Sequence, residues 1–87
     1  MGKTIMLVDD AKVVLLKLSR ILEEAGYEIV AEATSGTEAV EKYKQCYPDL
    51  VIMDIIMPDM KGIDAVKNII KFDPDARIRV TLFVLFY

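Results

Sequence analysis

Short apolar runs alternate along this chain with stretches in which apolar residues recur every three or four positions. The runs predict strands at 4–8, 28–33, 49–53 and 77–87, and the helical spacing predicts helices over 11–25, 35–47 and 62–71. Connections between these elements are short, and no repeat or linker interrupts them. This strict alternation predicts an α/β fold, an open parallel sheet built from right-handed strand–helix–strand units.

The helix over 35–47 has the clearest local signals. Ser35 stands three residues before Glu38, which is the spacing of a capping box at a helix start. Glu38 and Lys42 lie four residues apart and are predicted to pair on the helix surface. Tyr43 falls at one of the apolar positions, so its ring is expected in the core.

Two of the predicted strands end in carboxylates. The run ending at Met53 is followed at once by Asp54, and the run 4–8 by Asp9 and Asp10. In open parallel sheets, ligands bind beyond the carboxyl ends of the strands. If the first and third strands are neighbours, these three acids meet at one edge of the sheet.

Such a group of acids has a defined chemistry. Three carboxylates within ~5 Å of one another repel by several kcal/mol and require a proton or a cation. Oxygen ligands suit Mg²⁺, and a carboxylate beside Mg²⁺ can attack phosphorus to form an acyl phosphate. This interpretation assigns the attack to Asp54 and the metal to Asp9 and Asp10. The alternative, that Asp9 and Asp10 merely cap the following helix, stays open.

Composition narrows the classes of function. The chain has 87 residues, enough for one domain, and a net charge of −3, so nucleic-acid binding and a basic membrane-binding face are not expected. One cysteine and no histidine exclude an internal disulfide and a Cys/His metal site. Without a signal-peptide pattern or an apolar run of about 20 residues, a cytoplasmic location is predicted.

The positions of these acids also match a known family. The chain resembles the response-regulator receiver domain of two-component signalling from Lys3 to about Ile78, and stand-alone chemotaxis regulators look most similar. The matching residues are Asp9, Asp10, Asp54, Met57, Pro58 and Gly62. The resemblance implies a flavodoxin-like sheet with strand order 2-1-3-4.

The same resemblance implies a role for each matching residue. Asp54 would accept a phosphoryl group from the phosphohistidine of a histidine kinase. Asp10 and Asp54 would bind Mg²⁺ directly, Asp9 through water, and Ile56 through its backbone carbonyl. The loop into the third helix would be shaped by Met57, Pro58 and Gly62. Such a phosphorelay domain promotes its own phosphorylation, is not a conventional turnover enzyme, and signals to a downstream protein.

The chain departs from the family after its fourth strand. Receiver domains continue with a helix, a strand and a second helix, so residues 1–87 are interpreted as a single receiver domain that is truncated at its C-terminal side. The family's switch Ser or Thr falls on Leu82. Thr81, one residue earlier, is expected to face the other side of the sheet, unless a one-residue bulge brings it into the switch position. The family's Lys-Pro pair has no match either. Phosphorylation is therefore expected to be impaired. A natural truncation, an engineered one and a change of reading frame all remain possible origins.

Two other functions remain under consideration. The segment from Leu82 to Phe86 is apolar and uncharged, and an edge strand of this kind invites pairing with a second chain. A homo-oligomer through residues 80–87 is therefore predicted. The whole chain would then be a non-catalytic, self-associating interaction module that keeps a relic acidic pocket. A Mg²⁺-dependent phosphatase of another α/β family is disfavoured, because Ile56 stands where such enzymes need a second carboxylate.

Overall fold

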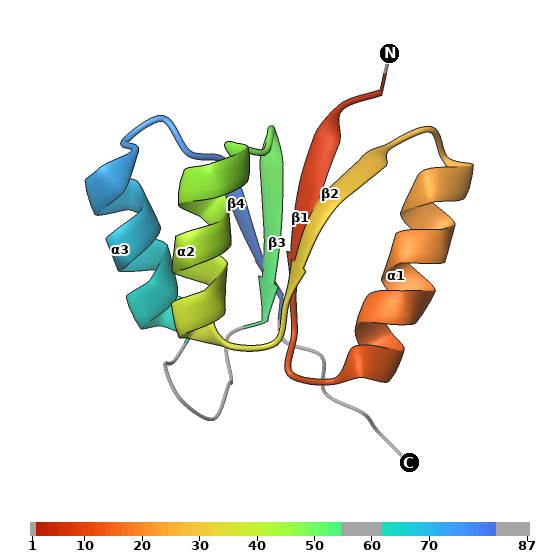
Figure 1. Ribbon diagram of the computed structural model, residues 1–87, viewed down its shortest axis with the longest axis horizontal. Coiled ribbons are helices and arrows are strands. Elements are labelled where there is room, and N and C mark those ends of the chain that lie inside the picture. Colours follow the sequence, from red (N-terminus) through yellow and green to blue (C-terminus); the bar gives the residue numbers. More distant parts are fainter. Residues whose placement is uncertain (1, 55–61, 82–87) are drawn as a thin grey trace.

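Along the part of the chain that the structure describes, four parallel strands and three helices alternate, as the sequence predicts (Figure 1). In this computed structural model, residues 2–54 and 62–81 are described. In chain order the elements are β1 (Thr4–Val8), α1 (Lys12–Glu24), β2 (Glu28–Ala33), α2 (Gly36–Cys46), β3 (Leu50–Asp54), α3 (Gly62–Phe72) and β4 (Ile78–Thr81). The strands lie in the order β2-β1-β3-β4, which confirms the predicted open sheet.

The helices are divided between the two faces of the sheet. Figure 1 shows α1 on one side, and α2 and α3 together on the other. Under α1, Ile5 and Leu7 of β1 pack with Leu15. The larger core lies under α2 and α3 and contains Met6, Val8, Ala33, Ala39, Tyr43, Val51, Met53, Ala65 and Ile69. The central strands β1 and β3 are covered on both faces, which explains why their sequences are apolar without interruption.

The ends of two helices follow the sequence signals. The hydroxyl of Ser35 accepts a hydrogen bond from the Glu38 amide at 3.1 Å, and the Glu38 carboxylate accepts one from the Thr34 amide at 2.8 Å. This confirms the predicted capping box, with Thr34 rather than Ser35 as the second donor. At the end of α1, Gly26 has φ +98°, a conformation that glycine adopts without strain.

The fourth strand is described over a shorter range than the sequence suggests. β4 runs from Ile78 to Thr81, and the rest of the predicted strand, 82–87, lies outside the described residues. β4 pairs with β3 through Val51–Ile78, Ile52–Arg79, Met53–Val80 and Asp54–Thr81. None of the described helices is long and apolar enough to cross a bilayer.

Candidate functional site

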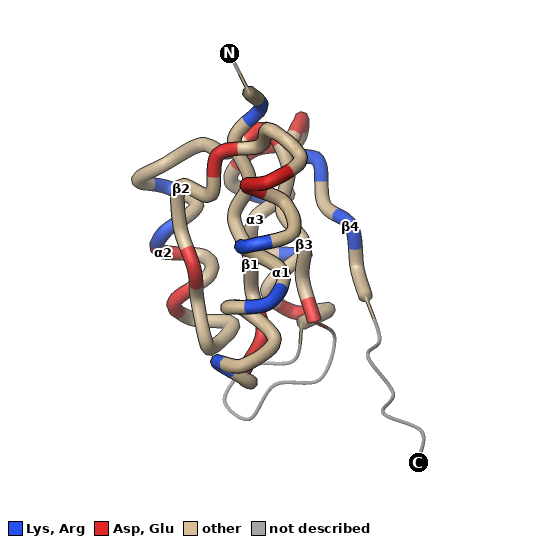
Figure 2. The backbone as a smooth tube through the Cα atoms, turned by 90° about the vertical axis from the view of Figure 1, so that its right-hand side faces the viewer, with Lys and Arg blue, Asp and Glu red and all other residues tan. Residues whose placement is uncertain are grey.

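Asp9 and Asp54 meet because β1 and β3 are neighbours in register. Val8 pairs with Met53, so the next residue on each strand arrives at the same point on the carboxyl edge of the sheet. Both side chains are nearly covered, with Asp9 4% and Asp54 9% exposed, whereas Asp10 is exposed. Figure 2 shows acidic positions gathered at this lower end of β1 and β3.

The three predicted acids form one cluster. Carboxylate oxygens of Asp9, Asp10 and Asp54, one from each residue, all lie within 4.8 Å of one another. The sheet therefore brings these acids as close together as the sequence argument requires, and it does so at the edge where open parallel sheets bind ligands.

Asp9 shows how crowded the cluster is. Burial raises the pKa of the Asp9 carboxyl above its ordinary value, the Ala11 amide opposes this rise, and the charges of Asp54 and Asp10 add to it. The protein interior thus disfavours a third negative charge here. A cation among the three carboxylates would offset this penalty.

The helix-capping interpretation of Asp9 and Asp10 is wrong. The N-cap of α1 is Ala11, which makes no side-chain capping bond. Asp9 instead accepts a hydrogen bond from the Ala11 amide at 2.9 Å, which holds the turn between β1 and α1. Its carboxylate is thereby oriented at the end of the strand rather than at the first turn of the helix.

Thr81 lies beside the acidic cluster, on the side where the sequence argument did not expect it. The register pairs Thr81 with Asp54, and paired residues of adjacent strands project to the same face of a sheet. The Thr81 hydroxyl donates to the Met53 carbonyl at 3.4 Å. Strand alternation within β4 could not reveal this arrangement, because it depends on how β4 aligns with β3.

The remaining predicted site residues are only partly described. Ile56, Met57 and Pro58 lie outside the described residues. Gly62 is the first residue of α3 and is buried there, so the helix begins at the predicted position.

Comparison with known proteins is consistent with this geometry. Residues 5–83 match the family model of the response regulator receiver domain. The chain belongs to this family. Its fold, with strand order 2-1-3-4 among the described residues, is the receiver fold of the chemotaxis type.

Three relatives illustrate the likeness. The chemotaxis protein CheY of Thermotoga maritima is 56% identical over 80 residues, which is 92% of this chain and 67% of that protein. CheY in the CheX–CheY–BeF₃–Mg²⁺ complex of Borrelia burgdorferi has 39% identity and a TM-score of 0.87, over 90% of this chain and 60% of that one. The response regulator TrrA of Thermotoga maritima, solved with Mg²⁺-BeF, has 41% identity and a TM-score of 0.82, over 87% and 65%. This receiver chain thus spans roughly two thirds of the length of the proteins it matches.

The donor set of this receiver domain fits the magnesium ion named for two of those relatives. All three clustered ligands are carboxylate oxygens, the hard donors that Mg²⁺ prefers over nitrogen or sulfur. Asp10 is exposed, which leaves a path for water and for an incoming phosphoryl group.

Proposed function

We propose that the chain is a phosphoryl-accepting signalling domain in which Asp54 is the acceptor. A single observation carries this proposal: a carboxylate that is 9% exposed ends the central strand beside two others, within 4.8 Å. Asp54 is held by its strand rather than by a flexible loop, so its oxygen has a defined direction of attack.

The reaction is a transfer between a phosphohistidine and a carboxylate. One Asp54 oxygen attacks phosphorus, the bond between phosphorus and the imidazole nitrogen breaks, and an acyl phosphate forms on Asp54. The departing imidazole keeps the electron pair and takes up a proton. Asp10 and Asp54 would hold Mg²⁺ directly, with Asp9 acting through water. Bound Mg²⁺ would supply charge neutralisation for the incoming phosphoryl group.

Thr81 is the proposed hydroxyl beside the phosphoryl group. Its pairing with Asp54 supports this role, although the family's usual position for this hydroxyl falls on Leu82. The carbonyl of Ile56 as a metal ligand, and loop shaping by Met57, Pro58 and Gly62, remain predictions from the family resemblance.

The partners and location follow from this chemistry. A histidine kinase would donate the phosphoryl group, and a downstream protein would bind the modified domain. The Borrelia burgdorferi relative was crystallised with CheX, which supports protein partners for domains of this type. A cytoplasmic location, where such a kinase would present its phosphohistidine, is part of the proposal.

Acetyl phosphate tests the acceptor directly. Incubated with Mg²⁺, the chain should gain the mass of one phosphoryl group, detected by intact-protein mass spectrometry and lost on treatment with hydroxylamine. Asp54→Asn should gain none, whereas Asp49→Asn, at the opposite end of β3, should be labelled like the parent chain. Equal labelling of the Asp54→Asn variant would reject this acceptor. A chain that takes no label and binds no Mg²⁺ would instead be the non-catalytic interaction module.

A further inference from the structure

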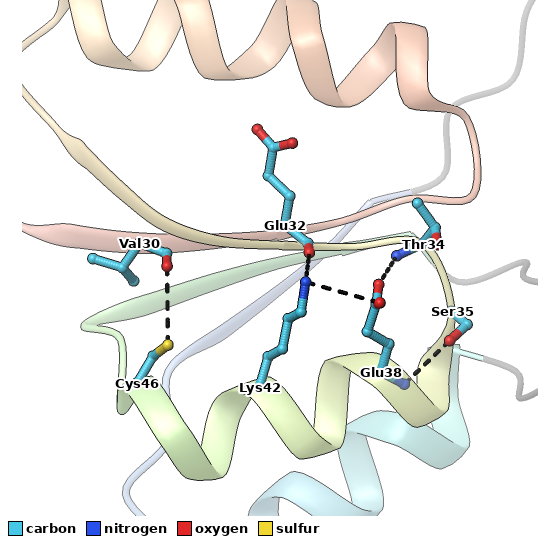
Figure 3. A network of polar contacts seen from close by, with 7 residues as sticks. All are labelled: Val30, Glu32, Thr34, Ser35, Glu38, Lys42 and Cys46. Carbon is cyan, nitrogen blue, oxygen red and sulfur yellow. Dashed lines mark hydrogen bonds and ion pairs between the residues drawn. The ribbon is translucent and has the colours of Figure 1, made fainter.

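Two side chains of α2 hold the backbone at the carboxyl end of β2 (Figure 3). The Lys42 ammonium donates to the Glu32 carbonyl at 2.6 Å, and the Glu38 carboxylate accepts from the Thr34 amide at 2.8 Å. The same ammonium lies 3.8 Å from the other Glu38 oxygen, so the two side chains also contact each other. The stretch 32–34 is therefore held at both of its ends by one helix.

Ala33, the residue between these two contacts, supports Asp9 of the acidic cluster. Its carbonyl accepts a hydrogen bond from the Asp9 amide at 3.0 Å, and its side chain is completely buried in the core. The Asp9 carboxylate is fixed in turn by the Ala11 amide at 2.9 Å. The backbone of Asp9 is thus anchored to β2 and its carboxylate to the turn into α1. The position of Asp9 in the cluster therefore depends on where the stretch 32–34 lies.

Strand pairing alone holds this part of β2 less firmly than a regular ladder would. The register of β2 against β1 shifts between Ile5 and Met6, and Val30 falls at the shift. A shift of this kind interrupts the hydrogen-bond ladder. At the shift itself, the Cys46 thiol makes only a weak contact of 3.9 Å with the Val30 carbonyl. The stretch 32–34 lies beyond the interruption, where side chains of α2 supply the additional bonds.

The bond from Lys42 is the strongest type among these contacts. A charged donor at 2.6 Å from a carbonyl oxygen makes a charge-assisted hydrogen bond, roughly twice as strong as a neutral one. The ion pair with Glu38 adds little stability by itself, because the two side chains are 37% and 40% exposed and their charged atoms are 3.8 Å apart. Its effect is to orient the ammonium toward the Glu32 carbonyl.

We propose that Lys42 and Glu38 are positioning residues for the acidic cluster. By fixing the stretch 32–34, they keep Asp9 where it completes the group of carboxylates that binds Mg²⁺. Both act through the Ala33 carbonyl and the Asp9 amide, and not through contact with the ion. This inference rests on the proposed function, since it takes the cluster to be a magnesium site.

Magnesium titrations followed by amide shifts in NMR test this role, because native amide signals come from folded molecules alone. Lys42→Met removes the donor but keeps a side chain of similar length. It should weaken Mg²⁺ binding about threefold, less than loss of a carboxylate would, because Lys42 acts through the backbone. Lys42→Arg restores a charged donor and should bind like the parent chain. Lys44→Met, an equal change of charge on the same helix, should also bind like the parent.

Two results of these titrations would overturn the proposal. Unchanged affinity in Lys42→Met would show that the bond to the Glu32 carbonyl does not position the site. Equal weakening by Lys44→Met would show that net charge, rather than this bond, sets the affinity.

Variants of Glu38 separate the backbone bond from the ion pair. Glu38→Gln keeps an oxygen acceptor for the Thr34 amide and should bind Mg²⁺ nearly like the parent chain. Glu38→Ala removes the acceptor and should weaken binding about as much as Lys42→Met does. A folded Glu38→Ala variant with the affinity of the parent chain would contradict the role given to Glu38.

Hydrogen exchange without Mg²⁺ gives a second readout, which does not depend on the proposed function. In Lys42→Met and Glu38→Ala, exchange of the Asp9 amide should accelerate by a larger factor than exchange of the Val51 amide, which bonds to the Arg77 carbonyl on the far side of the sheet. Equal factors would mean general destabilisation and would overturn the inference. If the parent chain binds no Mg²⁺, the proposed function fails, and exchange of the Asp9 amide alone decides whether these side chains position it.

Discussion

Aspartates gather at both ends of this parallel sheet, but the two ends treat them differently. At the carboxyl end, Asp9, Asp10 and Asp54 come within 4.8 Å of one another, and burial with neighbouring charges raises the pKa of Asp9. At the amino end, Asp49 accepts hydrogen bonds from the Thr4 amide and hydroxyl at 2.8 and 3.1 Å. Those bonds lower the pKa of Asp49 below its ordinary value.

A second aspartate at the amino end is also satisfied by the protein. The buried Tyr43 donates its hydroxyl proton to the Asp73 carboxylate at 2.6 Å, and the Asp75 amide donates to the other oxygen at 3.1 Å. Aspartates therefore stabilise the amino end of the sheet through hydrogen bonds, whereas at the carboxyl end they repel one another. The carboxyl end is the one suited to a cation and a phosphoryl group. Structural aspartates are stabilised by hydrogen-bond donors of the protein itself, whereas the carboxylates of a cation site keep negative charge that the ion neutralises.

The largest contrast should appear in magnesium binding. Asp10→Asn removes one charged ligand and should weaken Mg²⁺ binding at least about tenfold, as followed by amide shifts in NMR titrations. Asp75→Asn, an equal change of charge at the amino end, should leave the affinity unchanged. Equal weakening by both variants would mean that net charge alone attracts the ion.

Removal of a hydroxyl should cost stability at the amino end. Tyr43→Phe leaves an Asp73 oxygen without its donor and should lower the free energy of unfolding by about 1 kcal/mol, measured by urea titration. Tyr47→Phe, whose side chain is 57% exposed, is the matched control and should have little effect. Tyr43→Phe should bind Mg²⁺ like the parent chain, and weaker binding would show that the two ends are coupled.

Removal of a charge at the carboxyl end should increase stability, whereas removal of the Tyr43 hydroxyl at the amino end should decrease it. Without Mg²⁺, Asp10→Asn relieves repulsion in the cluster and should raise the free energy of unfolding, by less than about 1 kcal/mol because Asp10 is exposed. At saturating Mg²⁺ the parent chain should instead have the higher free energy of unfolding, because it binds the ion more tightly than Asp10→Asn does. Lower stability of the variant in the absence of metal would contradict mutual repulsion among these acids.

The smallest effect concerns pH at the amino end. Because the folded state lowers the pKa of Asp49 below 3.8, its contribution to stability is present above that value and is lost as the pH falls through the lowered pKa. Thermal unfolding at a series of acidic pH values should therefore show a slightly shallower decline for Asp49→Asn than for the parent chain. Parallel curves would indicate that the bonds from Thr4 contribute nothing to acid stability.

Local patterns predicted the elements of this fold well because helix and strand periods are properties of neighbouring residues. Ser35 and Glu38 marked the start of α2, and Gly26 marked the end of α1. Tyr43 was correctly placed in the core, but its spacing gave no sign of the bond to Asp73, which lies 30 residues away. Lys42 was expected to pair with Glu38 and does so, yet its shorter bond to the Glu32 carbonyl depends on how α2 packs against β2.

The acidic site was predictable for a different reason. Parallel strands joined by right-handed crossovers all end at the same edge of the sheet. Acids that directly follow two neighbouring strands must therefore lie close together. The expected meeting of Asp9, Asp10 and Asp54 is confirmed. The expected orientation of Thr81 was wrong, because a shift of one residue between neighbouring strands reverses the face to which a side chain points.

The sequence by itself thus determined the order of strands and helices, the apolar faces that pack, and the acids that follow β1 and β3. Only the tertiary structure decided the register that sets Thr81 beside Asp54, the partners that satisfy Asp49 and Asp73, and the bond from Lys42 to the Glu32 carbonyl of β2. The physical reason is the separation along the sequence of the groups that interact. Periodicity and capping depend on residues a few positions apart, whereas strand register and pKa shifts depend on groups that meet only when the chain has folded.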